Sequence, residues 1–399
     1  MQKEDKVCNI TPANRVGSVQ EYYFSKKLKE VAEMNAAGKN VINLGVGSPD
    51  LPPSEQTIET LCEHARKANE HGYQPYVGIP ELRKGFADWY KTWYDVDLDP
   101  KTEIQPLIGS KEGILHVTLA FVNPGEQVLV PNPGYPTYTS LSKILGAEVV
   151  NYNLKEENGW MPDMDELRAA VTEKTKLLVL NSPSNPTGVV YPREILEQIA
   201  ALAQEKNFLV LSDEVYEKLL FDNTEYVSIA SLPGMWERTI TINGFSKAFA
   251  MTGWRMGYLA AHPDLILPML KTHQLCVASS NVIAQNACIT ALRAGEESVD
   301  AMRKEYAARR RYLLNAFAKI PELTCVAPTG TFYIYPNVTG SGMGGKEFAN
   351  RLLEDYGVAT VPGTAFDSFC NTNIRISYAS SMENLQTAIS RIEDMLHHR

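Results

Sequence analysis

The chain has 399 residues, of which 44% are hydrophobic and 21% are charged, and its formal net charge at pH 7 is −9. A chain of this length usually folds into two packed domains, and this composition is that of an ordinary soluble globular protein. Its lysines and arginines are scattered rather than gathered in a stripe, so no nucleic acid is expected as a partner. No apolar run reaches the ~18 residues of a membrane helix, so no membrane is expected either.

The six cysteines contain no C-x-x-C pair and are interpreted as reduced thiols. The first residues, Met1–Lys6, lack the apolar core of a signal peptide, and together these features predict a cytoplasmic protein. The seven histidines show neither an H-E-x-x-H motif nor another ligand spacing, so no metal site is predicted.

The N-terminal part is predicted to be mainly helical. The expected elements are a helix over 19–37 that ends at Gly38, a strand over 41–44, a helix from the N-cap Ser54 to about 69, and a helix over 80–94.

Strands and helices alternate from residue 104 onward. We predict strands over 104–108, 127–131, 148–152, 176–180, 208–211 and 239–242. We predict helices over 111–122, 136–145, 163–171 and 192–206. The strands are nearly continuous apolar runs, which is typical of a mainly parallel sheet buried on both faces.

Long helices dominate after residue 258. They are expected over 263–294, with a break near 279–281, and over 298–319. A smaller segment then combines strands over 331–335 and 374–378 with helices over 346–356 and 382–397. We therefore predict an α/β fold with a large domain over 48–290 and a small α+β domain formed by 1–47 and 291–399.

One lysine lies in an unusual setting. Lys247 follows the predicted strand over 239–242, and phenylalanine, alanine and methionine surround it in the sequence. Apolar surroundings lower the pKa of a lysine from about 10.4, which yields the free amine that forms a Schiff base. A lysine at a helix start that keeps its charged amine in water would explain the same residues. The other polar residues of the sequence must therefore decide between a reactive lysine and a solvent-exposed one.

Five polar residues each follow a different predicted strand. They are Ser110, Tyr135, Asn185, Asp213 and Lys247. Ligands of an open α/β sheet bind at the carboxyl ends of its strands, so these side chains are expected in one crevice. Each also has a plainer explanation as a turn, a helix cap or a loop residue.

The set fits the chemistry of pyridoxal phosphate, which needs a lysine amine and a partner for its ring nitrogen. Asp213 can keep that nitrogen protonated, since a carboxylate about 3 Å away contributes roughly 5 kcal/mol at a dielectric of ~20. Asn185 and Tyr216 can hydrogen-bond the phenolic oxygen, and Tyr135 can stack on the ring.

A phosphate needs N–H donors and positive charge. Gly109, Ser110 and Lys111 begin a predicted helix, whose N-terminus offers backbone N–H groups and a favourable dipole. The guanidinium of Arg255 can add a bidentate hydrogen bond to the phosphate.

Six motifs in this order resemble those of the class I aminotransferases, which are fold-type-I pyridoxal-phosphate enzymes, and they cover nearly the whole chain. They are Gly47-Ser-Pro-Asp50, Pro133-Gly-Tyr-Pro136, Asn185-Pro-Thr-Gly188, Ser212-Asp-Glu-Val-Tyr216, Ser246-Lys247 with Arg255 and Gly257, and Asn373-Ile-Arg-Ile-Ser377. The resemblance implies a large domain with a mainly parallel seven-stranded sheet between helices, and a smaller α+β domain.

The same resemblance implies an amino-acid aminotransferase. Such an enzyme moves an α-amino group between an amino acid and a 2-oxo acid, in a ping-pong cycle between the pyridoxal and pyridoxamine forms of its cofactor. Lys247 would bind the cofactor and carry the proton between the substrate Cα and the cofactor C4′. Arg375 would hold the substrate α-carboxylate, aided by Asn185 and the backbone near Gly47. Tyr73 would reach the cofactor phosphate of a neighbouring subunit, which implies a homodimer with shared active sites.

The chain departs from the family pattern at Ser48, where several members have a glutamate, and in two further ways. Gly244 stands where many members have a serine or threonine that contacts the phosphate, and Ser246 is the candidate replacement. We also find no second arginine that would bind a dicarboxylic side chain, so the substrate preference stays open.

Two other activities remain to be weighed. A carbon–sulfur β-lyase of the same fold would use Lys247 and Asp213 in the same way. The pattern Gly340-x-Gly-x-x-Gly345 formally matches a dinucleotide fingerprint, but Pro336 interrupts the preceding strand and a surface loop explains the glycines better.

Overall fold

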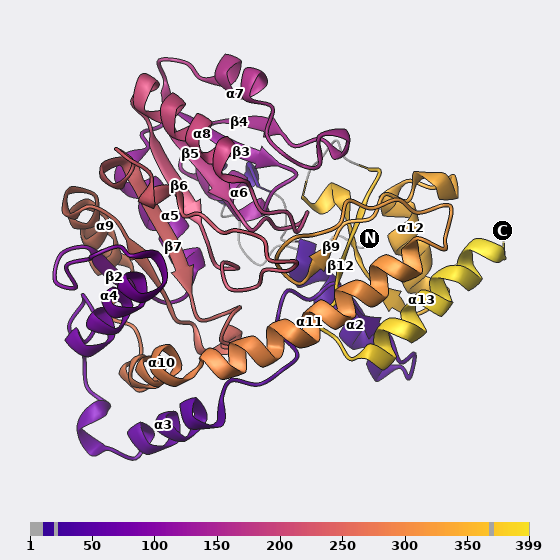
Figure 1. Ribbon diagram of the computed structural model, residues 1–399, viewed down its shortest axis with the longest axis horizontal. Helices are drawn as coiled ribbons and strands as arrows, with labels where there is room; N and C mark the ends of the chain where they lie inside the picture. Colours follow the sequence, from indigo (N-terminus) through magenta and orange to yellow (C-terminus); the bar gives the residue numbers. More distant parts are fainter. Residues whose placement is uncertain (1–10, 20–22, 367–370, 399) are drawn as a thin grey trace.

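A seven-stranded sheet forms the centre of the larger part of the molecule, with strand order β2-β8-β7-β6-β5-β3-β4. The computed structural model describes residues 11–19, 23–366 and 371–398, and Figure 1 shows their arrangement. The strands are β2 (Ile104–Leu107), β3 (Gln127–Asn132), β4 (Glu148–Asn153), β5 (Thr175–Asn181), β6 (Leu209–Asp213), β7 (Thr239–Gly244) and β8 (Gly257–Ala260). Neighbouring strands are parallel except at β8, which is antiparallel to both β2 and β7.

Helices cover both faces of this sheet. One layer contains α5 (Ser110–Phe121), α6 (Pro136–Ile144) and α9 (Pro263–Cys276), and the other contains α7 (Met164–Ala170) and α8 (Arg193–Lys206). On β5, Leu177 and Val179 enter the core beside α5, whereas Leu178 and Leu180 enter the core beside α8. Burying each such side chain contributes about 1.5–3 kcal/mol, which explains why the central strands are apolar along their length.

A further group of helices packs beside β2 and β8. It contains α3 (Glu55–Ala65), α4 (Pro80–Tyr94) and α10 (Val282–Ala294). The Oγ of Ser54 accepts a hydrogen bond from the Thr57 N–H at 3.3 Å, which confirms the predicted N-cap of α3.

A second, smaller unit surrounds three short antiparallel strands. They are β11 (Val361–Pro362), β12 (Ile374–Ser377) and β9 (Tyr333–Ile334), while β1 (Ile42–Asn43) pairs in parallel with β10 (Val358–Ala359). The helices here are α2 (Tyr23–Ala36), α11 (Glu296–Phe317), α12 (Gly345–Glu354) and α13 (Met382–His397), whereas α1 (Asn14–Gly17) contacts α6 of the larger part. In Figure 1 the long α11 runs from α10 toward α13, and it contacts both helices.

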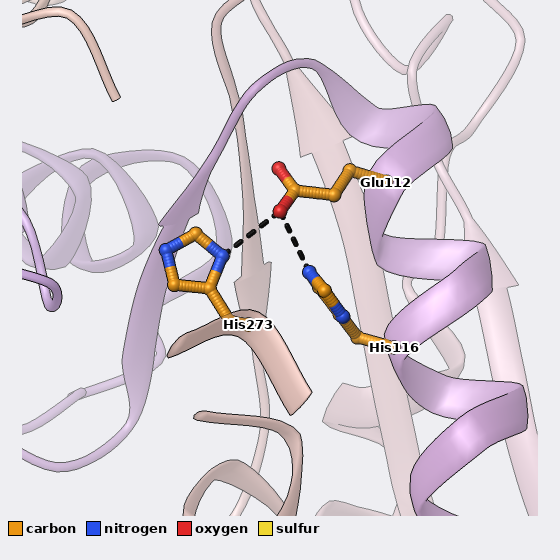
Figure 2. Close-up of side chains that lie close together, drawn as sticks. All are labelled: Glu112, His116 and His273. Carbon is orange, nitrogen blue, oxygen red and sulfur yellow. Dashed lines mark hydrogen bonds and ion pairs between the residues drawn. The ribbon is translucent and has the colours of Figure 1, made fainter. Parts of the chain in front are cut away.

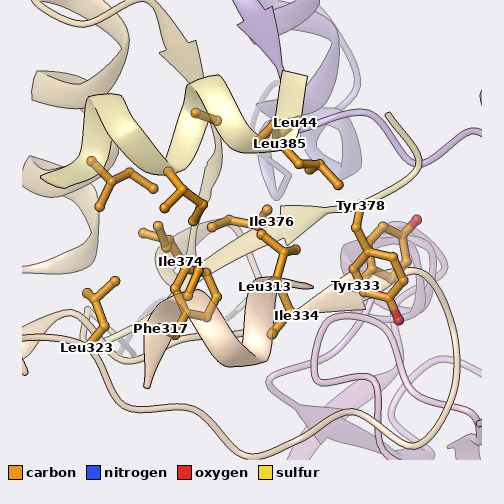
Figure 3. Packing of buried hydrophobic residues seen from close by; sticks show 14 of the residues in the cluster. Leu44, Leu313, Phe317, Leu323, Tyr333, Ile334, Ile374, Ile376, Tyr378 and Leu385 are labelled. Carbon is orange, nitrogen blue, oxygen red and sulfur yellow. The ribbon is translucent and has the colours of Figure 1, made fainter. Parts of the chain in front are cut away.

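The core of this unit joins distant parts of the chain. Figure 3 shows Leu313 and Phe317 of α11 packed near Ile374 and Ile376 of β12, with Leu385 of α13 above them. Short 3₁₀ turns connect the main elements, at Ala68–Glu70, Glu156–Asn158, Ile229–Ser231, Trp236–Arg238, Thr252–Trp254, Thr339–Ser341 and Gly363–Ala365. Among the described helices, none has the combined length and apolarity that a membrane crossing requires.

The mainly parallel sheet between helices is confirmed, and the predicted helices over 80–94 and 382–397 coincide with α4 and α13. The predicted break near 279–281 separates α9 from α10. The sequence prediction missed β8, because Gly257–Ala260 contains no β-branched residue that would mark a strand. The domain bounds, 48–290 and 1–47 with 291–399, remain a prediction.

An ion pair ties α11 to the chain segment that leads from β1 to α3. The Nη1 of Arg309 lies 2.8 and 2.9 Å from the two carboxylate oxygens of Asp50, and the Tyr306 hydroxyl donates to the same carboxylate at 3.2 Å. The Arg309 side chain is only 5% exposed and that of Asp50 is 26% exposed. Removing the guanidinium would therefore leave the partly buried Asp50 carboxylate without its cationic partner, and it would also remove the pair that Arg309 forms with the more exposed Glu305 at 2.9 Å.

We expect Arg309→Met to lower the free energy of unfolding by about 2 kcal/mol, measured by urea denaturation. Arg303→Met is the matched control on α11, because Arg303 and Asp300 form a pair with side chains 39% and 48% exposed. The control should change stability by less than about 1 kcal/mol. Equal losses in the two variants would contradict a special role of the Asp50 pair.

Candidate active site

Lys247 lies in the loop after β7, and its Nζ donates a hydrogen bond to the Gly47 carbonyl oxygen. Burial and the Arg375 guanidinium lower the pKa of Lys247 to about 7, although the Asp213 carboxylate acts in the opposite direction. The amine is thus largely neutral in mildly alkaline solution, as its apolar setting led us to expect. Lys247 stands in a loop, so its interpretation as a lysine at a helix start is wrong.

Asp213 ends β6 and is only 6% exposed. Its Oδ2 accepts a hydrogen bond from the Tyr138 hydroxyl at 2.6 Å. Burial raises the pKa of Asp213, and the bond from Tyr138 offsets this only in part. A cation placed against this carboxylate would restore its ionised form. A turn follows Asp213 instead of a helix, which excludes the alternative role as a helix cap.

Asn181 joins two of the predicted site residues. Its Nδ2 donates to the Asp213 carbonyl at 3.0 Å, and its Oδ1 accepts the Asn185 N–H at 2.8 Å. This single side chain therefore fixes the ends of β5 and β6 relative to each other. Sequence analysis missed both Asn181 and Tyr138, although Asn181 precedes Asn185 by four residues and Tyr138 follows Tyr135 by three.

Arg375, on β12, is 2% exposed and points toward Asn185. Its Nη1 donates to the Asn185 Oδ1 at 2.8 Å, and its Nη2 donates to the Gly45 carbonyl at 2.8 Å. The Nε finds no acceptor within the described ranges. Three aromatic rings surround the guanidinium, with centroids 4.1, 4.9 and 5.2 Å from its carbon, and they belong to Tyr333, Phe366 and Phe24.

Tyr216 also lies near Lys247, whose Nζ is 5.6 Å from the tyrosine ring centroid. The Tyr216 hydroxyl is 3.0 Å from the Tyr333 hydroxyl. Tyr333 is another residue that sequence analysis did not single out, after Asn181 and Tyr138. A Cβ at Gly47 would lie 2.5 Å from the Tyr333 hydroxyl, so only glycine lets the chain pass between Tyr333 and Lys247.

The start of α5 lies against a guanidinium. Gly109 has a φ of 76°, and a Cβ there would collide with the Arg255 Nη2. A Cβ at Gly257 would lie 2.6 Å from the Ser110 N–H nitrogen, so this close approach also needs glycine. The Lys111 Nζ lies 5.5 Å from the centroid of the Tyr135 ring. The Lys111 and Arg255 side chains and the first N–H groups of α5 therefore lie close together, as expected of an anion-binding site.

The glycine at position 244 has a steric cause. A Cβ at Gly244 would lie 2.9 Å from both the Gly257 Cα and the Met256 carbonyl oxygen, because β7 and β8 approach closely here. A serine or threonine does not fit without moving one strand. Ser246, the candidate replacement, is 8% exposed in the following loop.

Tyr73 stands apart from the other candidates. It lies in the loop before α4 and is 94% exposed, so it does not pack against its own chain. The rival segment Gly340–Gly345 forms the turn into α12, which packs on the antiparallel strands of the small unit. That setting lacks the parallel βαβ unit that a dinucleotide fingerprint requires.

Comparison with known proteins agrees with this geometry. Residues 39–392 match the model of the family "Aminotransferase class I and II". An aspartate aminotransferase of Pyrococcus abyssi is 40% identical over 93% of this chain and 95% of its own length. An LL-diaminopimelate aminotransferase of Oleidesulfovibrio alaskensis is 36% identical over 97% of this chain and 99% of its own.

Solved structures give the same result. An aspartate aminotransferase of Thermus thermophilus, determined with maleate, superposes with a TM-score of 0.92 at 34% identity and covers 96% of this chain and 99% of its own. An aromatic aminotransferase of Pyrococcus horikoshii has a TM-score of 0.87 at 38% identity, covering 92% of this chain and 99% of its own. The chain belongs to the class I and II aminotransferases, and it is a pyridoxal-phosphate-dependent enzyme that transfers amino groups between amino acids and 2-oxo acids.

Proposed function

We propose that this transfer takes place where Lys247, Asp213 and Arg375 meet. The observation that carries the proposal is the amine of Lys247, whose pKa is lowered to about 7 beside one buried carboxylate and one buried guanidinium. A neutral amine can accept a proton and can bond to an aldehyde carbon, and both abilities are needed here.

The residues present fit the cofactor. Asp213 is buried with a raised pKa and favours a cation, which suits a protonated ring nitrogen. The cradle of Gly109, Ser110 and Lys111 beneath Arg255 suits a phosphate. Tyr216 and Asn185 would donate to the phenolic oxygen, Tyr135 would stack on the ring, and Ser246 would add a polar contact. When bound, pyridoxal phosphate supplies a ring that takes up the electron pair left as the substrate Cα loses its proton.

The side chains then divide the remaining work. Arg375 binds the α-carboxylate of the substrate, held in place by Asn185 and by the backbone of the segment that contains Gly47. With the cofactor bound, Lys247 would take the proton from the substrate Cα and would carry it to the cofactor C4′. A 2-oxo acid reverses the steps in the second half-reaction.

We also propose that the enzyme is a cytoplasmic homodimer with shared active sites. Exposure of 94% at Tyr73 supports a role outside its own chain. A hollow of about 450 Å³ beside the start of α5 has room for a partner side chain, and its lining includes Lys111, Thr137, Ser140 and Arg255. The free thiols of the described cysteines, Cys62, Cys276, Cys288 and Cys325, support the location.

Borohydride should fix the cofactor covalently to Lys247 in the purified enzyme. The lowered pKa of Lys247 makes it the reactive amine, so peptide mapping should find the label on this lysine. Lys247→Ala should bind cofactor without being labelled. A label on another lysine would refute the assignment. Continued formation of the keto acid without added 2-oxoglutarate, beyond one molecule per active site, would instead favour the β-lyase.

The pH profile of cofactor capture by the apoenzyme should report the Lys247 amine. The neutral form captures, so the rate should fall about tenfold per pH unit below the pKa. Arg375→Met removes a cation that lowers this pKa, so the midpoint should move to higher pH. Asp213→Asn removes an anion that raises it, so the midpoint should move to lower pH. Stopped-flow absorbance measures both, with the exposed Arg303→Ala as control. If the midpoint pH moved in the same direction in both variants, the proposed placement of Arg375 and Asp213 beside the Lys247 amine would be contradicted.

Mixing two inactive variants tests the shared site. Lys247→Ala and Tyr73→Asp should regain activity after subunit exchange, because one of the two sites then combines native Lys247 with the native Tyr73 of the other chain. Lys247→Ala mixed with Asp213→Asn is the matched control. Those residues belong to the same chain's site, so no intact site can form. Recovery in both mixtures, or in neither despite demonstrated exchange, would reject the shared site.

A further inference from the structure

Three ionisable side chains meet behind the start of α5. Figure 2 shows Glu112 and His116 on α5 and His273 on α9, all pointing toward one another. Glu112 Oε1 lies 2.6 Å from His116 Nε2 and 2.9 Å from His273 Nδ1. Both histidine side chains are fully buried, and that of Glu112 is 11% exposed. The sequence showed no such cluster, because His273 comes from a distant helix.

The hydrogen bonds indicate where the protons lie. Thr272 has one hydroxyl proton and donates it to the Met269 carbonyl at 2.8 Å. Its oxygen lies 3.1 Å from His116 Nδ1 and, with its proton directed to Met269, can accept a hydrogen bond from a protonated Nδ1. His116 Nε2 faces the carboxylate and carries a proton. A proton on Nδ1 in addition would make the ring of His116 an imidazolium, paired with the Glu112 carboxylate.

His273 contacts the same carboxylate from α9. Its Nδ1 donates to Glu112, and its Nε2 has no partner among the described residues, which suits an unprotonated nitrogen. Burial alone would raise the pKa of Glu112, but hydrogen bonds from His116, His273 and the Ile108 N–H lower it to about 2. The carboxylate therefore stays ionised at neutral pH.

This cluster is coupled to the proposed phosphate site through one backbone group. Glu112 Oε2 accepts the Ile108 N–H at 2.5 Å, and Ile108 directly precedes Gly109. Ile108, Lys111, Glu112 and Arg255 also line the same hollow. A carboxylate in the first turn of α5 would repel a phosphate dianion, unless a positive charge such as that of His116 compensates it.

We propose that Glu112, His116 and His273 form a buried support for the phosphate site, in which Glu112 orients the Gly109–Ser110 turn and the His116 imidazolium cancels the charge of Glu112. The three are positioning residues and do not touch the cofactor. The inference rests on the proposed placement of the phosphate at Gly109–Lys111. A tetrahedral metal would hold its ligand atoms about 3.3 Å apart. The observed O–N separations of 2.6 and 2.9 Å are those of hydrogen bonds.

The test compares two cofactors on the full-length enzyme. Glu112→Gln should speed the release of pyridoxal phosphate by about tenfold, because an amide has one accepting oxygen and cannot accept from the histidines and from the Ile108 N–H at once, so the turn loses its anchor. Release of pyridoxal, which lacks the phosphate, should change less than twofold. General destabilisation would speed both releases alike, and that outcome would overturn the proposal. Unchanged release of both would overturn it too.

Two further variants complete the design. Glu126→Gln is the matched control, since Glu126 accepts the Asn123 N–H at 2.7 Å beyond the far end of α5, and it should leave both releases unchanged. Arg255→Gln tests the phosphate site itself. If it speeds the release of pyridoxal phosphate while Glu112→Gln does not, the inference alone fails. If neither variant discriminates between the cofactors, the phosphate placement fails and the inference fails with it.

Nitrogen NMR of histidine-labelled enzyme examines the protons directly, with His116→Asn used for assignment. Two protonated ring nitrogens at His116 at pH 7, and one at His273, are expected. A neutral His116, or one bound divalent metal per chain that Glu112→Gln removes, would overturn the proposal.

Discussion

The site depends on the burial of one amine. Lys247 is removed from water beside the Arg375 guanidinium, and both features favour the uncharged amine. The same burial raises the pKa of Asp213. Without a ligand, the pKa of the amine and that of the carboxyl are therefore both shifted toward the uncharged form. The sheet makes this possible, because β6 and β7 are parallel neighbours and bring both residues to one edge. Arg375 arrives from the small unit, so the site exists only where the two parts of the chain meet.

Much of this arrangement followed from local sequence patterns. Apolar strand runs and helix caps predicted the alternating elements, and the order of polar residues after successive strands predicted which of them would meet. Lys247, Asp213 and Asn185 could be found in this way, whereas Arg375 was expected only from the family resemblance. Their proximity in the structure agrees with the motifs, while their roles remain proposals tested by the experiments above.

The supporting contacts could not be predicted because they join residues without a local pattern. Tyr138 reaches Asp213 across 75 positions of sequence, and His273 reaches Glu112 across 161. No periodicity within one element encodes such a pair. β8 was missed for a related reason: its place between β2 and β7 is set by pairing with two distant strands. Gly244 belongs to the same class, since its need for glycine comes from Gly257 on the neighbouring strand.

The two hydrogen bonds of Arg375 have a consequence for the entropy of ligand binding. Asn185 and Gly45 each take one N–H group of the guanidinium, which leaves further donors for a carboxylate. A free arginine side chain would lose about 2 kcal/mol of rotamer entropy when a ligand orders it. Here the side chain is already ordered by folding, between three aromatic rings. A carboxylate therefore meets a rigid, preorganised receptor, and the cost of ordering this arginine falls on folding instead of on each catalytic turnover.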